Sequence, residues 1–341
     1  MKTAVKKKAY AAAGVDVALG NQVKSGLQEK LKRTFGPEVL GRIGGFGGLF
    51  RAEFGDMKEP VLVSSIDGVG TKLKVAIALN SHESVAQDLV NHCINDIAVI
   101  GARPLFFLDY IGAERLNPNV FDQLISGFTK ACKAGNCALI GGETAQLPDL
   151  YHHGEYDLAG CIVGVVDRPK IFDGSRIVAS DLLLGLPSNG LHTNGFSLAR
   201  KVLLQQMRLE FSQKPEGLSR PLGEELLRIH KNYQPLLTTV PASRIKGAAH
   251  ITGGGLVDNI PRILPAICDA LIDTNSWKVP SIFRLIQRGG RISTEEMYEV
   301  FNMGIGMVLV VARHHAEEVA TKAGAKVIGQ VTPGSGRVLL S

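Results

Sequence analysis

Apolar runs of strand length alternate with longer amphipathic stretches through the first half of the chain, and this alternation is the strongest constraint on its fold. The strand-like runs are "PVLVSSI", "LFFLDYI", "CALIGG" and "LAGCIVGVV". Between the first two, "SVAQDLVNHCINDIAVIG" has helical periodicity, with Ser84 as its expected cap and Gly101 as its stop. Asn119 is expected to begin the next helix. Strands separated by helices predict a mixed α/β fold.

The second half of the chain repeats this pattern after a polar segment that contains Pro169 and Gly174. Its strand-like and helical stretches are, in order, "LLLGLPSNG", "GFSLARKVLLQQM", "AAHITGGG" and "GIGMVLVVA". A chain of 341 residues is too long for most single hydrophobic cores. We therefore expect two α/β domains, residues 1–170 and 171–341.

Composition and charge argue against several classes of protein. The net charge of +6 comes from scattered basic residues, which favours small anionic ligands over nucleic acid. No apolar stretch reaches the roughly 18 residues of a membrane span, and the N-terminal apolar segment is too broken for a signal peptide. The five cysteines are irregularly spaced and lack a C-x-x-C pair, which argues against a disulfide framework or a cysteine-based zinc site. We expect a cytoplasmic protein.

Four glycine-rich loops border the predicted strands: "GRIGGFGGLF", "IDGVGTKLK", "LIGGETAQLP" and "HITGGGLVDN". Glycine lets backbone N–H groups approach an anion closely, so loops of this kind favour phosphate. The spacing matches neither the Walker A motif nor the dinucleotide-binding fingerprint. The loops therefore indicate phosphate binding outside the P-loop kinases and the Rossmann dehydrogenases.

Three acidic residues accompany these loops. Asp67 follows one predicted strand, and Glu143 follows another. Asp96 lies on the helix between them, with Asn95 beside it and His92 one turn before it. If the two strands are parallel neighbours, the three carboxylates converge at one end of the sheet. Because Mg²⁺ binds oxygen ligands and bridges to nucleotide phosphates, the pattern predicts a metal–phosphate site.

Each of these residues also has a purely structural interpretation. Asp67 fits a turn, Asp96 a solvated helix face, and Glu143 a surface ion pair. His192, in "GLHTNGFSL", suits acid–base chemistry or anion binding near neutral pH, but a hydrogen-bonded loop histidine is the simpler interpretation. The three glycines from Gly253 suit either phosphate binding or a tight turn between a strand and a helix.

Ten motifs, taken in order, resemble those of one family. They are "GVDVALGN", "GGFGGLF", "DGVGTKLK", "ND", "PLFFLDYIG", "GGETAQLPDLY", "YDLAGCIVGVV", "GLHTNGFSL", "HITGGGLVDNIPRILP" and "FNMGIGM". They extend from about Ala9 to the late 330s, nearly the whole chain. The chain thus resembles the aminoimidazole ribonucleotide synthetases, or phosphoribosylformylglycinamidine cyclo-ligases, of purine biosynthesis.

The resemblance implies a homodimer in which the N-terminal sheets of two subunits join into a barrel, with each C-terminal α/β domain and its mixed sheet packed beside it. It implies cyclisation of formylglycinamidine ribonucleotide with ATP, through an iminophosphate, to give 5-aminoimidazole ribonucleotide, ADP and phosphate. Mg²⁺ is the implied metal, and the family commonly uses K⁺. Residues 1–170 would then bind ATP and Mg²⁺ and dimerise, and residues 171–341 would complete the active site.

The resemblance also implies roles for individual residues. Asp67, Asp96 and Glu143 would hold the metal, and His192 would transfer a proton or contact phosphate, with Asn194 beside it. Contacts to ATP or to the substrate are implied for a set of mostly loop residues. This set comprises Gly44, Gly45, Gly47, Gly48, Gly68, Gly70, Thr71, Lys72, Asn95, Thr252, Gly253 and Gly254.

Two positions depart from the family pattern. Gln28 stands where the family usually has a lysine near the ATP site, and Lys24 and Lys30 are the neighbouring candidates to replace it. Ile66 stands where a threonine usually precedes the aspartate. These departures motivate an alternative from another class, a non-catalytic binding protein. Among enzymes, the alternatives are related ATP-dependent enzymes such as selenophosphate synthetase, thiamine-monophosphate kinase and formylglycinamidine ribonucleotide synthetase.

Overall fold

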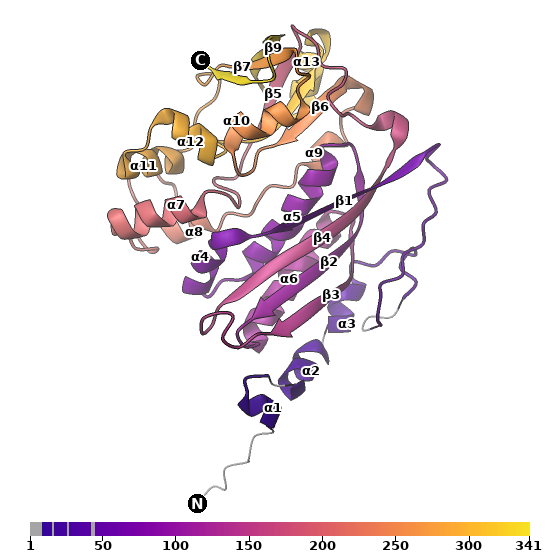
Figure 1. Ribbon diagram of the computed structural model, residues 1–341, viewed down its shortest axis with the longest axis vertical. Helices are drawn as coiled ribbons and strands as arrows, with labels where there is room; N and C mark the ends of the chain where they lie inside the picture. Colours follow the sequence, from indigo (N-terminus) through magenta and orange to yellow (C-terminus); the bar gives the residue numbers. More distant parts are fainter. Residues whose placement is uncertain (1–8, 16, 26, 42–44) are drawn as a thin grey trace, which may run out of the picture.

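The first of two β-sheets is built from the N-terminal half of the chain (Figure 1). The computed structural model describes residues 9–15, 17–25, 27–41 and 45–341. The strands of this sheet, in the spatial order β1-β4-β2-β3, are β1 Pro60–Gly68, β4 Tyr156–Asp167, β2 Arg103–Ala113 and β3 Ala138–Gln146. The β2–β3 pair is parallel, and the β1–β4 and β2–β4 pairs are antiparallel.

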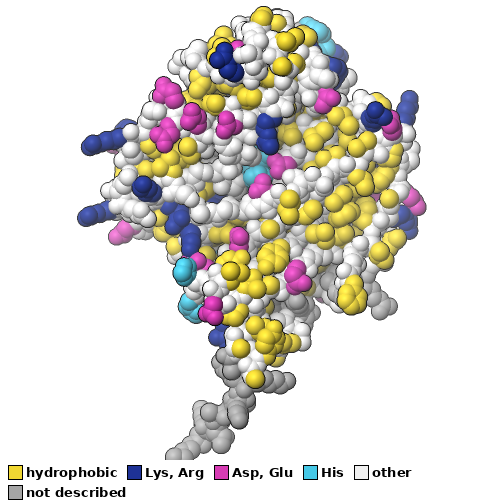
Figure 2. All heavy atoms as spheres, in the orientation of Figure 1, with side chains coloured by type: hydrophobic (Ala, Val, Ile, Leu, Met, Phe, Trp, Pro, Cys, Tyr) yellow, Lys and Arg dark blue, Asp and Glu magenta, His cyan; other side chains and the backbone are white. Residues whose placement is uncertain are grey.

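Only one face of this first sheet is covered within the chain. Helices α5 (Glu83–Ala98) and α6 (Pro118–Ala134) lie behind the strands in Figure 1. Residues of β1 alternate between partly buried and exposed, and Leu62 and Ile66 are 64% and 72% exposed on the other face. Figure 2 shows hydrophobic side chains gathered over these strands. The alternation is that of a strand with one covered face, but the open face here is apolar.

Both helices begin slightly earlier than the sequence predicts, α5 by two residues and α6 by one. Asn117, not Asn119, caps α6: its side-chain oxygen accepts the N–H groups of Asn119 and Val120 at 3.0 and 3.4 Å. Pro118 then occupies the first helical position, which suits its fixed φ. The residue that precedes α5 is His82, not Ser84. The N–H of His82 donates to the Gln123 side chain on α6, and His82 makes no side-chain cap hydrogen bond to α5.

The second sheet has six strands in the order β10-β7-β9-β5-β8-β6. They are β5 Leu182–Pro187, β6 Ile245–His250, β7 Cys268–Ile272, β8 Ile305–Val311, β9 Lys326–Pro333 and β10 Val338–Leu340. The β7–β10 pair is parallel and the other pairs are antiparallel, so this sheet is mixed, as expected. Among the described residues neither sheet closes into a barrel.

This second sheet is covered on both faces, and every residue of β8, between β5 and the edge strand β6, is buried. Val308 and Val310 belong to one hydrophobic cluster, whereas Met307, Leu309 and Val311 belong to another. Because successive strand residues point to opposite faces, the two clusters are the two covered faces.

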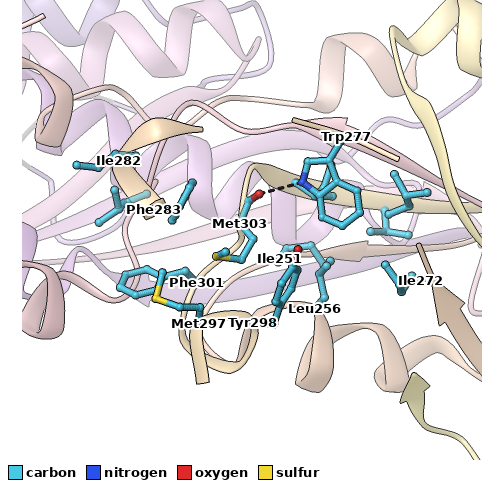
Figure 3. Close-up of a cluster of buried hydrophobic side chains, with 14 of the residues drawn as sticks. Ile251, Leu256, Ile272, Trp277, Ile282, Phe283, Met297, Tyr298, Phe301 and Met303 are labelled. Carbon is cyan, nitrogen blue, oxygen red and sulfur yellow. Dashed lines mark hydrogen bonds between the residues drawn. The ribbon is translucent and has the colours of Figure 1, made fainter. Parts of the chain in front are cut away.

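One of these clusters is shown in Figure 3. Trp277 lies within it and donates its indole N–H to the Met303 carbonyl at 2.9 Å. Phe283 and Phe301 meet edge to face, with ring centroids 5.9 Å apart. The indole therefore satisfies its only polar group inside an apolar core.

The remaining helices connect the strands. The short helices of the first half are α1 Ala9–Ala12, α2 Val17–Ser25, α3 Leu27–Lys32, η1 Gly70–Lys72, α4 Leu73–Ala78 and η2 Arg168–Lys170. Those of the second half are α7 Phe196–Arg200, η3 Lys201–Gln206, α8 Leu222–Leu226, α9 Gln234–Leu237, η4 Ala242–Arg244, α10 Gly255–Asn259, η5 Ile260–Ile263, α11 Ser281–Gly290, α12 Thr294–Val300, η6 Arg313–His315 and α13 Ala316–Ala323. In the part of the chain that is described, none of the helices has the length and apolarity of a bilayer span.

Candidate active site

Two of the predicted carboxylates lie together between the two sheets. Asp67 stands near the carboxyl end of β1, and Asp96 is on the last turn of α5. Both line a cavity of about 450 Å³, which His250 at the end of β6 and Thr252 just beyond it also line from the second sheet. The exposed Arg262 lines its outer part. The cavity is therefore assembled from both halves of the chain.

Asp67 forms an ion pair with a buried histidine. The Nε2 of His92 lies 2.9 Å from Asp67 Oδ2 and 3.9 Å from Asp96 Oδ2. Burial alone would raise the pKa of Asp67, but the hydrogen bond and charge of His92 hold it below its usual value. Burial likewise lowers the pKa of His92, yet the neighbouring carboxylates outweigh burial and raise it. The pair is thus an imidazolium and a carboxylate.

Asp96 is held by two groups from different strands. Its Oδ1 lies 2.8 Å from His250 Nδ1, and its Oδ2 accepts the Ser65 hydroxyl at 3.0 Å. Burial would raise the pKa of Asp96, but the His250 hydrogen bond, with further help from His92, keeps it below its usual value. Both Asp67 and Asp96 are therefore ionised near neutral pH.

A chain of hydrogen bonds continues from these pairs into the second half of the molecule. His250 Nε2 lies 2.9 Å from His230 Nε2, and His230 Nδ1 lies 3.3 Å from the Thr193 hydroxyl. That hydroxyl is 3.0 Å from His92 Nδ1. Three histidines, one threonine and two carboxylates thus form one continuous network.

The network has a consistent proton assignment in which His92 carries two protons and His230 and His250 carry one each. His250 Nδ1 faces a carboxylate and carries a proton, so its Nε2 accepts the Nε2 proton of His230. His230 Nδ1 then accepts the Thr193 hydroxyl, whose oxygen accepts the Nδ1 proton of His92. His92 also donates to Asp67, so it carries two protons. Burial lowers the pKa values of His230 and His250, which agrees with this assignment.

Glu143 does not join this group, and the predicted convergence of three carboxylates is wrong for a single chain. It lies on β3, which is the edge strand opposite β1 in the order β1-β4-β2-β3. Three strand spacings separate the two edges, about 14 Å. The sequence shows that each residue ends a strand, but the spatial order of strands is a tertiary property. The exposed Glu143 carboxylate accepts a hydrogen bond from the N–H of the next residue, Thr144.

Lys72 does not cradle a phosphate, and its predicted role is wrong. Its side chain is fully buried, and Nζ lies 2.7 Å from Asp88 Oδ2. The same nitrogen donates to the carbonyls of His192 at 3.0 Å and of Arg228 at 2.7 Å. All three ammonium protons are therefore used, and Lys72 ties the first half of the chain to the second.

Asn95 is a second predicted ligand residue that the fold uses elsewhere. It is fully buried, and its amide nitrogen donates to the Lys231 carbonyl at 2.8 Å. Its amide oxygen accepts the Tyr233 N–H, also at 2.8 Å. Because both ends of the amide bind backbone groups of one segment, Asn95 positions that segment and does not contact a ligand here.

His192 is the hydrogen-bonded loop histidine of the simpler interpretation. It is 1% exposed with φ of +61°, and its Nε2 accepts the Asn189 N–H at 2.9 Å. Its ring stacks on His230 with centroids 4.0 Å apart. Burial lowers its pKa well below the usual value, so the ring is neutral and away from solvent. A direct contact between His192 and phosphate is excluded in this conformation. The neighbouring Asn194 is only half-buried, so its side chain is more accessible to a ligand.

The glycine loops lie at different places. Gly44 falls outside the described residues; Gly45, Gly47 and Gly48 are exposed, and a Cβ at Gly48 would touch Ile140 on β3. That loop therefore lies against the opposite edge of the first sheet from Asp67.

The other loops lie near the cavity. The N–H of Gly68 donates to Asp67, and Gly70 has φ of +68°. Thr71 is exposed and shares a hydrogen bond of 2.9 Å with the Ser197 hydroxyl across the two halves. Thr252 lines the cavity, and Gly253 and Gly254 form the turn that leads from it into α10.

The two positions that depart from the family pattern are both on the surface. Gln28 is exposed, and the neighbouring Lys30 is paired with Asp122 and donates to Ser126. The side chain of Lys24 lies outside the described residues. Ile66 points to the open face of the first sheet, away from Asp67, because adjacent strand residues face opposite sides. Its missing hydroxyl therefore does not alter the carboxylate cluster.

Sequence reasoning missed His250, His230 and Thr193. His250 carried a usable signal, because it ends a strand just before a glycine loop, as Asp67 does. His230 lies in an irregular segment with no motif around it. Its role depends entirely on that segment packing against α5.

Comparison with known proteins identifies the family. Residues 54–166 match the N-terminal domain of the AIR synthase related proteins, and residues 178–340 match their C-terminal domain. The chain is 49% identical to the phosphoribosylformylglycinamidine cyclo-ligase of Syntrophotalea carbinolica, with 96% of this chain and 95% of that protein covered. Identity to the enzyme of the same name from Pseudothermotoga lettingae is 48%, with 97% and 99% covered.

Solved structures of other proteins share the fold. Thiamine-monophosphate kinase from Stenotrophomonas maltophilia superposes with a TM-score of 0.66 at 18% identity, with 96% of each chain covered. Hydrogenase maturation protein HypE in complex with ATP gives 0.67 at 14% identity, with 96% of this chain and 93% of that one covered. At these identities the likeness shows the architecture alone. The near-full-length relatives decide the family, and this chain belongs to the phosphoribosylformylglycinamidine cyclo-ligases.

Proposed function

We propose that this chain cyclises formylglycinamidine ribonucleotide to 5-aminoimidazole ribonucleotide with ATP, releasing ADP and phosphate. Membership of the cyclo-ligase family supports the reaction, and a solved structure of the same fold contains ATP. The observation that carries the proposal is the pair of ionised carboxylates, Asp67 and Asp96, at a cavity between the two sheets. Partly buried charges with an open approach are typical of a site built for a charged ligand.

The chemistry requires activation before ring closure. The formamide oxygen is a poor leaving group, so ATP transfers its terminal phosphoryl group to it and gives an iminophosphate. The amidine nitrogen then attacks that carbon, the C–O bond breaks, and phosphate leaves with the oxygen. The protein has mainly to position the two ligands and to neutralise charge. A cavity built from both halves of the chain suits this task.

Asp67 and Asp96 would hold Mg²⁺ on the nucleotide phosphates. They fit this ion because both are ionised oxygen donors that face the same cavity. One ion cannot reach both these residues and Glu143 on the opposite edge strand. We assign Glu143 to a separate metal–phosphate contact at the same carboxyl end of the sheet. K⁺ would serve as a further cation.

The remaining contacts would come from the loops that border the cavity. Gly70 and Thr71 lie at the end of β1, and the turn from Thr252 to Gly254 lies at the end of β6. Backbone N–H groups in such turns favour phosphate oxygens. We assign these groups, with Asn194 beside Gly253, to phosphate or ribose contacts.

We also propose that the open face of the first sheet is covered by a second copy of this chain. Leu62 and Ile66 are exposed there, and both edge strands, β1 and β3, lack a partner on their outer side among the described residues. A second four-stranded sheet would bury the apolar face and would pair the edges into a barrel. The glycine loop from Gly45 to Gly48, beside β3, would then lie near the joint between subunits.

The division of labour follows from this arrangement. Residues 1–170 would provide the dimer contact and the carboxylates, and residues 171–341 would complete the cavity. All five cysteines are free and four are buried, which fits a reducing compartment, so we assign the enzyme to the cytoplasm.

An assay of the purified chain tests the reaction. The protein would be incubated with formylglycinamidine ribonucleotide, MgATP and KCl, and both ADP and 5-aminoimidazole ribonucleotide would be measured. We expect the two products to form in equal amounts. ADP alone would indicate a kinase or ATPase, and absence of both products would indicate the non-catalytic binding protein.

Asp67→Asn tests the carboxylate site. Loss of one metal-facing charge is expected to lower kcat by about 10²–10³-fold, on the scale of removing a group that stabilises transition-state charge. The control is Asp149→Asn, at an exposed carboxylate of the same half of the chain. Thermal unfolding of both variants shows whether the fold is intact. A near-normal rate for Asp67→Asn would remove this residue from the metal site.

A further inference from the structure

We propose that His92, Asp96 and His250 form a site for a divalent transition-metal ion such as Zn²⁺, Mn²⁺ or Co²⁺. Such a site differs in class from an all-oxygen Mg²⁺ site, because two of its three protein donors are imidazole nitrogens. It stands independently of the cyclisation reaction, since it rests on the positions of three side chains.

The donor atoms have the spacing that such an ion requires. One donor atom from each of His92, Asp96 and His250 lies within 4.8 Å of the others. The individual separations are 2.8 Å from His250 Nδ1 to Asp96 Oδ1 and 3.9 Å from His92 Nε2 to Asp96 Oδ2. Tetrahedral ligands at about 2.1 Å from Zn²⁺ are about 3.4 Å apart, so only small shifts of these three side chains are needed. Asp67 Oδ2 lies beside the cluster, 2.9 Å from His92 Nε2.

The outer nitrogen of each histidine is already held. His92 Nδ1 is 3.0 Å from the Thr193 hydroxyl, and His250 Nε2 is 2.9 Å from His230 Nε2. Histidines that bind metals in proteins almost always have their second nitrogen fixed by such a partner, which sets the ring orientation. Here both rings present their remaining nitrogen to the carboxylates. The supporting contacts of a metal site are therefore in place.

The site also combines buried imidazole nitrogens with an open approach through its carboxylate side. The side chains of His92 and His250 are 5% and 3% exposed, whereas those of Asp96 and Asp67 are 25% and 37% exposed. The carboxylates face the cavity of about 450 Å³, which gives an ion a path from solvent. Ligand identity, spacing, second contacts and entry path together satisfy the requirements of a metal site.

The nitrogen donors decide which ions the site prefers. Mg²⁺ demands near-ideal octahedral oxygen coordination and keeps its water, whereas imidazole suits Zn²⁺, Co²⁺ and other first-row ions. A transition-metal ion bound here to two neutral imidazoles would release one net proton, that of the His92 imidazolium, and would break the hydrogen bond between His92 and Asp67. His250 and His230 would change tautomer, so that His250 Nε2 donates to His230 Nε2 and His250 Nδ1 is free to bind the ion. The ion would also occupy Asp96, so we expect Zn²⁺ to compete with Mg²⁺ for this carboxylate.

Titration of the metal-free, full-length protein with Co²⁺ tests the proposal without any substrate. We expect saturable binding of one ion per chain and an intense visible absorption, which Co²⁺ shows in four- or five-coordinate sites with nitrogen ligands. Zn²⁺ should displace the Co²⁺ at equimolar concentration, and Mg²⁺ should require at least a hundredfold excess. A weak spectrum like that of hexaaqua Co²⁺, or equal competition by Mg²⁺, would overturn the proposal.

Variants locate the bound ion. His92→Ala and His250→Ala should each weaken Co²⁺ binding by at least tenfold, whereas Thr193→Val should weaken it and Thr193→Ser should preserve it. The matched control is the double variant His314→Ala with His315→Ala, which removes two adjacent rings on the surface of the second half. If the control loses Co²⁺ binding and the His92 and His250 variants retain it, the proposed site is wrong. If a histidine variant fails to fold, the Co²⁺ spectrum of the wild-type protein and the comparison of Thr193→Val with Thr193→Ser still test the proposed site.

The outcome is separable from that of the cyclisation reaction. Co²⁺ binding with no aminoimidazole product would support the metal site and contradict the enzymatic proposal. Formation of 5-aminoimidazole ribonucleotide without the Co²⁺ spectrum of nitrogen ligation would support the enzymatic proposal and contradict the metal site.

Discussion

The two sheets of this molecule bury their strands to different extents. In the second sheet, the alternate residues Val308 and Leu309 of β8 enter hydrophobic clusters on opposite faces. In the first sheet, only one face is covered by helices, and Leu62 and Ile66 are exposed on the other. A sheet with two covered faces is complete within one chain. An apolar open face carries a free-energy cost until another surface covers it.

This difference suggests how the chain divides its tasks. The second sheet, which is covered on both faces, supplies one wall of the cavity, which His250 and Thr252 line. The first sheet supplies Asp67 near the end of a strand whose alternate, exposed residues, such as Leu62 and Ile66, remain available for a partner. The cavity lies where the two sheets meet, so the contacts that join them matter most.

The largest expected effect is at the contact that joins the two halves. Lys72→Met leaves the buried Asp88 without its charge partner and removes the donor to the carbonyls of His192 and Arg228. We expect a loss of about 3–5 kcal/mol in the free energy of unfolding, measured by urea denaturation. Lys74→Met is the control, because Lys74 pairs with Glu155 at the surface and should cost less than about 1 kcal/mol. Equal effects would contradict the role of Lys72.

The same leucine-to-alanine change in each sheet tests the comparison directly. Leu309→Ala removes a fully buried side chain from the second sheet and should lower the free energy of unfolding by about 2–5 kcal/mol at any protein concentration. Leu62→Ala removes a side chain that is 64% exposed in one chain. Its cost should be small for a dilute monomer and should grow with protein concentration as dimers form. Equal, concentration-independent losses would show that the first sheet needs no partner.

A charge on the open face should separate the subunits. Ile66→Asp places a carboxylate in the apolar patch, and we expect the dimer Kd to rise at least tenfold, about 1.4 kcal/mol. Sedimentation equilibrium measures this constant. Ile267→Asp is the matched control, because Ile267 is 77% exposed in the second half of the chain. Wild-type protein that remains monomeric at all concentrations would contradict the proposed dimer.

The last effect is on the pH dependence of stability and concerns the covered face of the first sheet. Asp109 on β2 has its pKa raised by burial, with a contribution from Glu143, from 3.8 to about 7. The folded state therefore holds a proton that the unfolded chain releases, so stability falls as pH rises from about 4 through 7. Asp109→Asn should remove this slope, seen as the pH dependence of the unfolding free energy. An unchanged slope would place the titrating group elsewhere.

Local sequence patterns predicted the parts of the fold that depend on neighbours along the chain. The alternation of strands and helices is confirmed, and Asp67 and Asp96 lie together because a strand end and a helix face meet where the chain returns. The predicted ligand contacts of Lys72 and Asn95 are wrong, because a polar residue beside a glycine loop can bind a buried protein group as well as a ligand. Their partners, such as Arg228 and Tyr233, lie far along the chain. No local pattern encodes that packing.

The sequence by itself determined the family, the α/β class and the two carboxylates of the cavity, because motif order and strand ends are local properties. Only the tertiary structure decided that Glu143 lies on the far edge strand and that His230 and His250 complete the network. It also decided that Ile66 faces away from Asp67, on the open side of the sheet. The physical reason is common to all three. Strand order and packing between the halves arise from burial of apolar surface summed over the whole chain, which no short stretch contains.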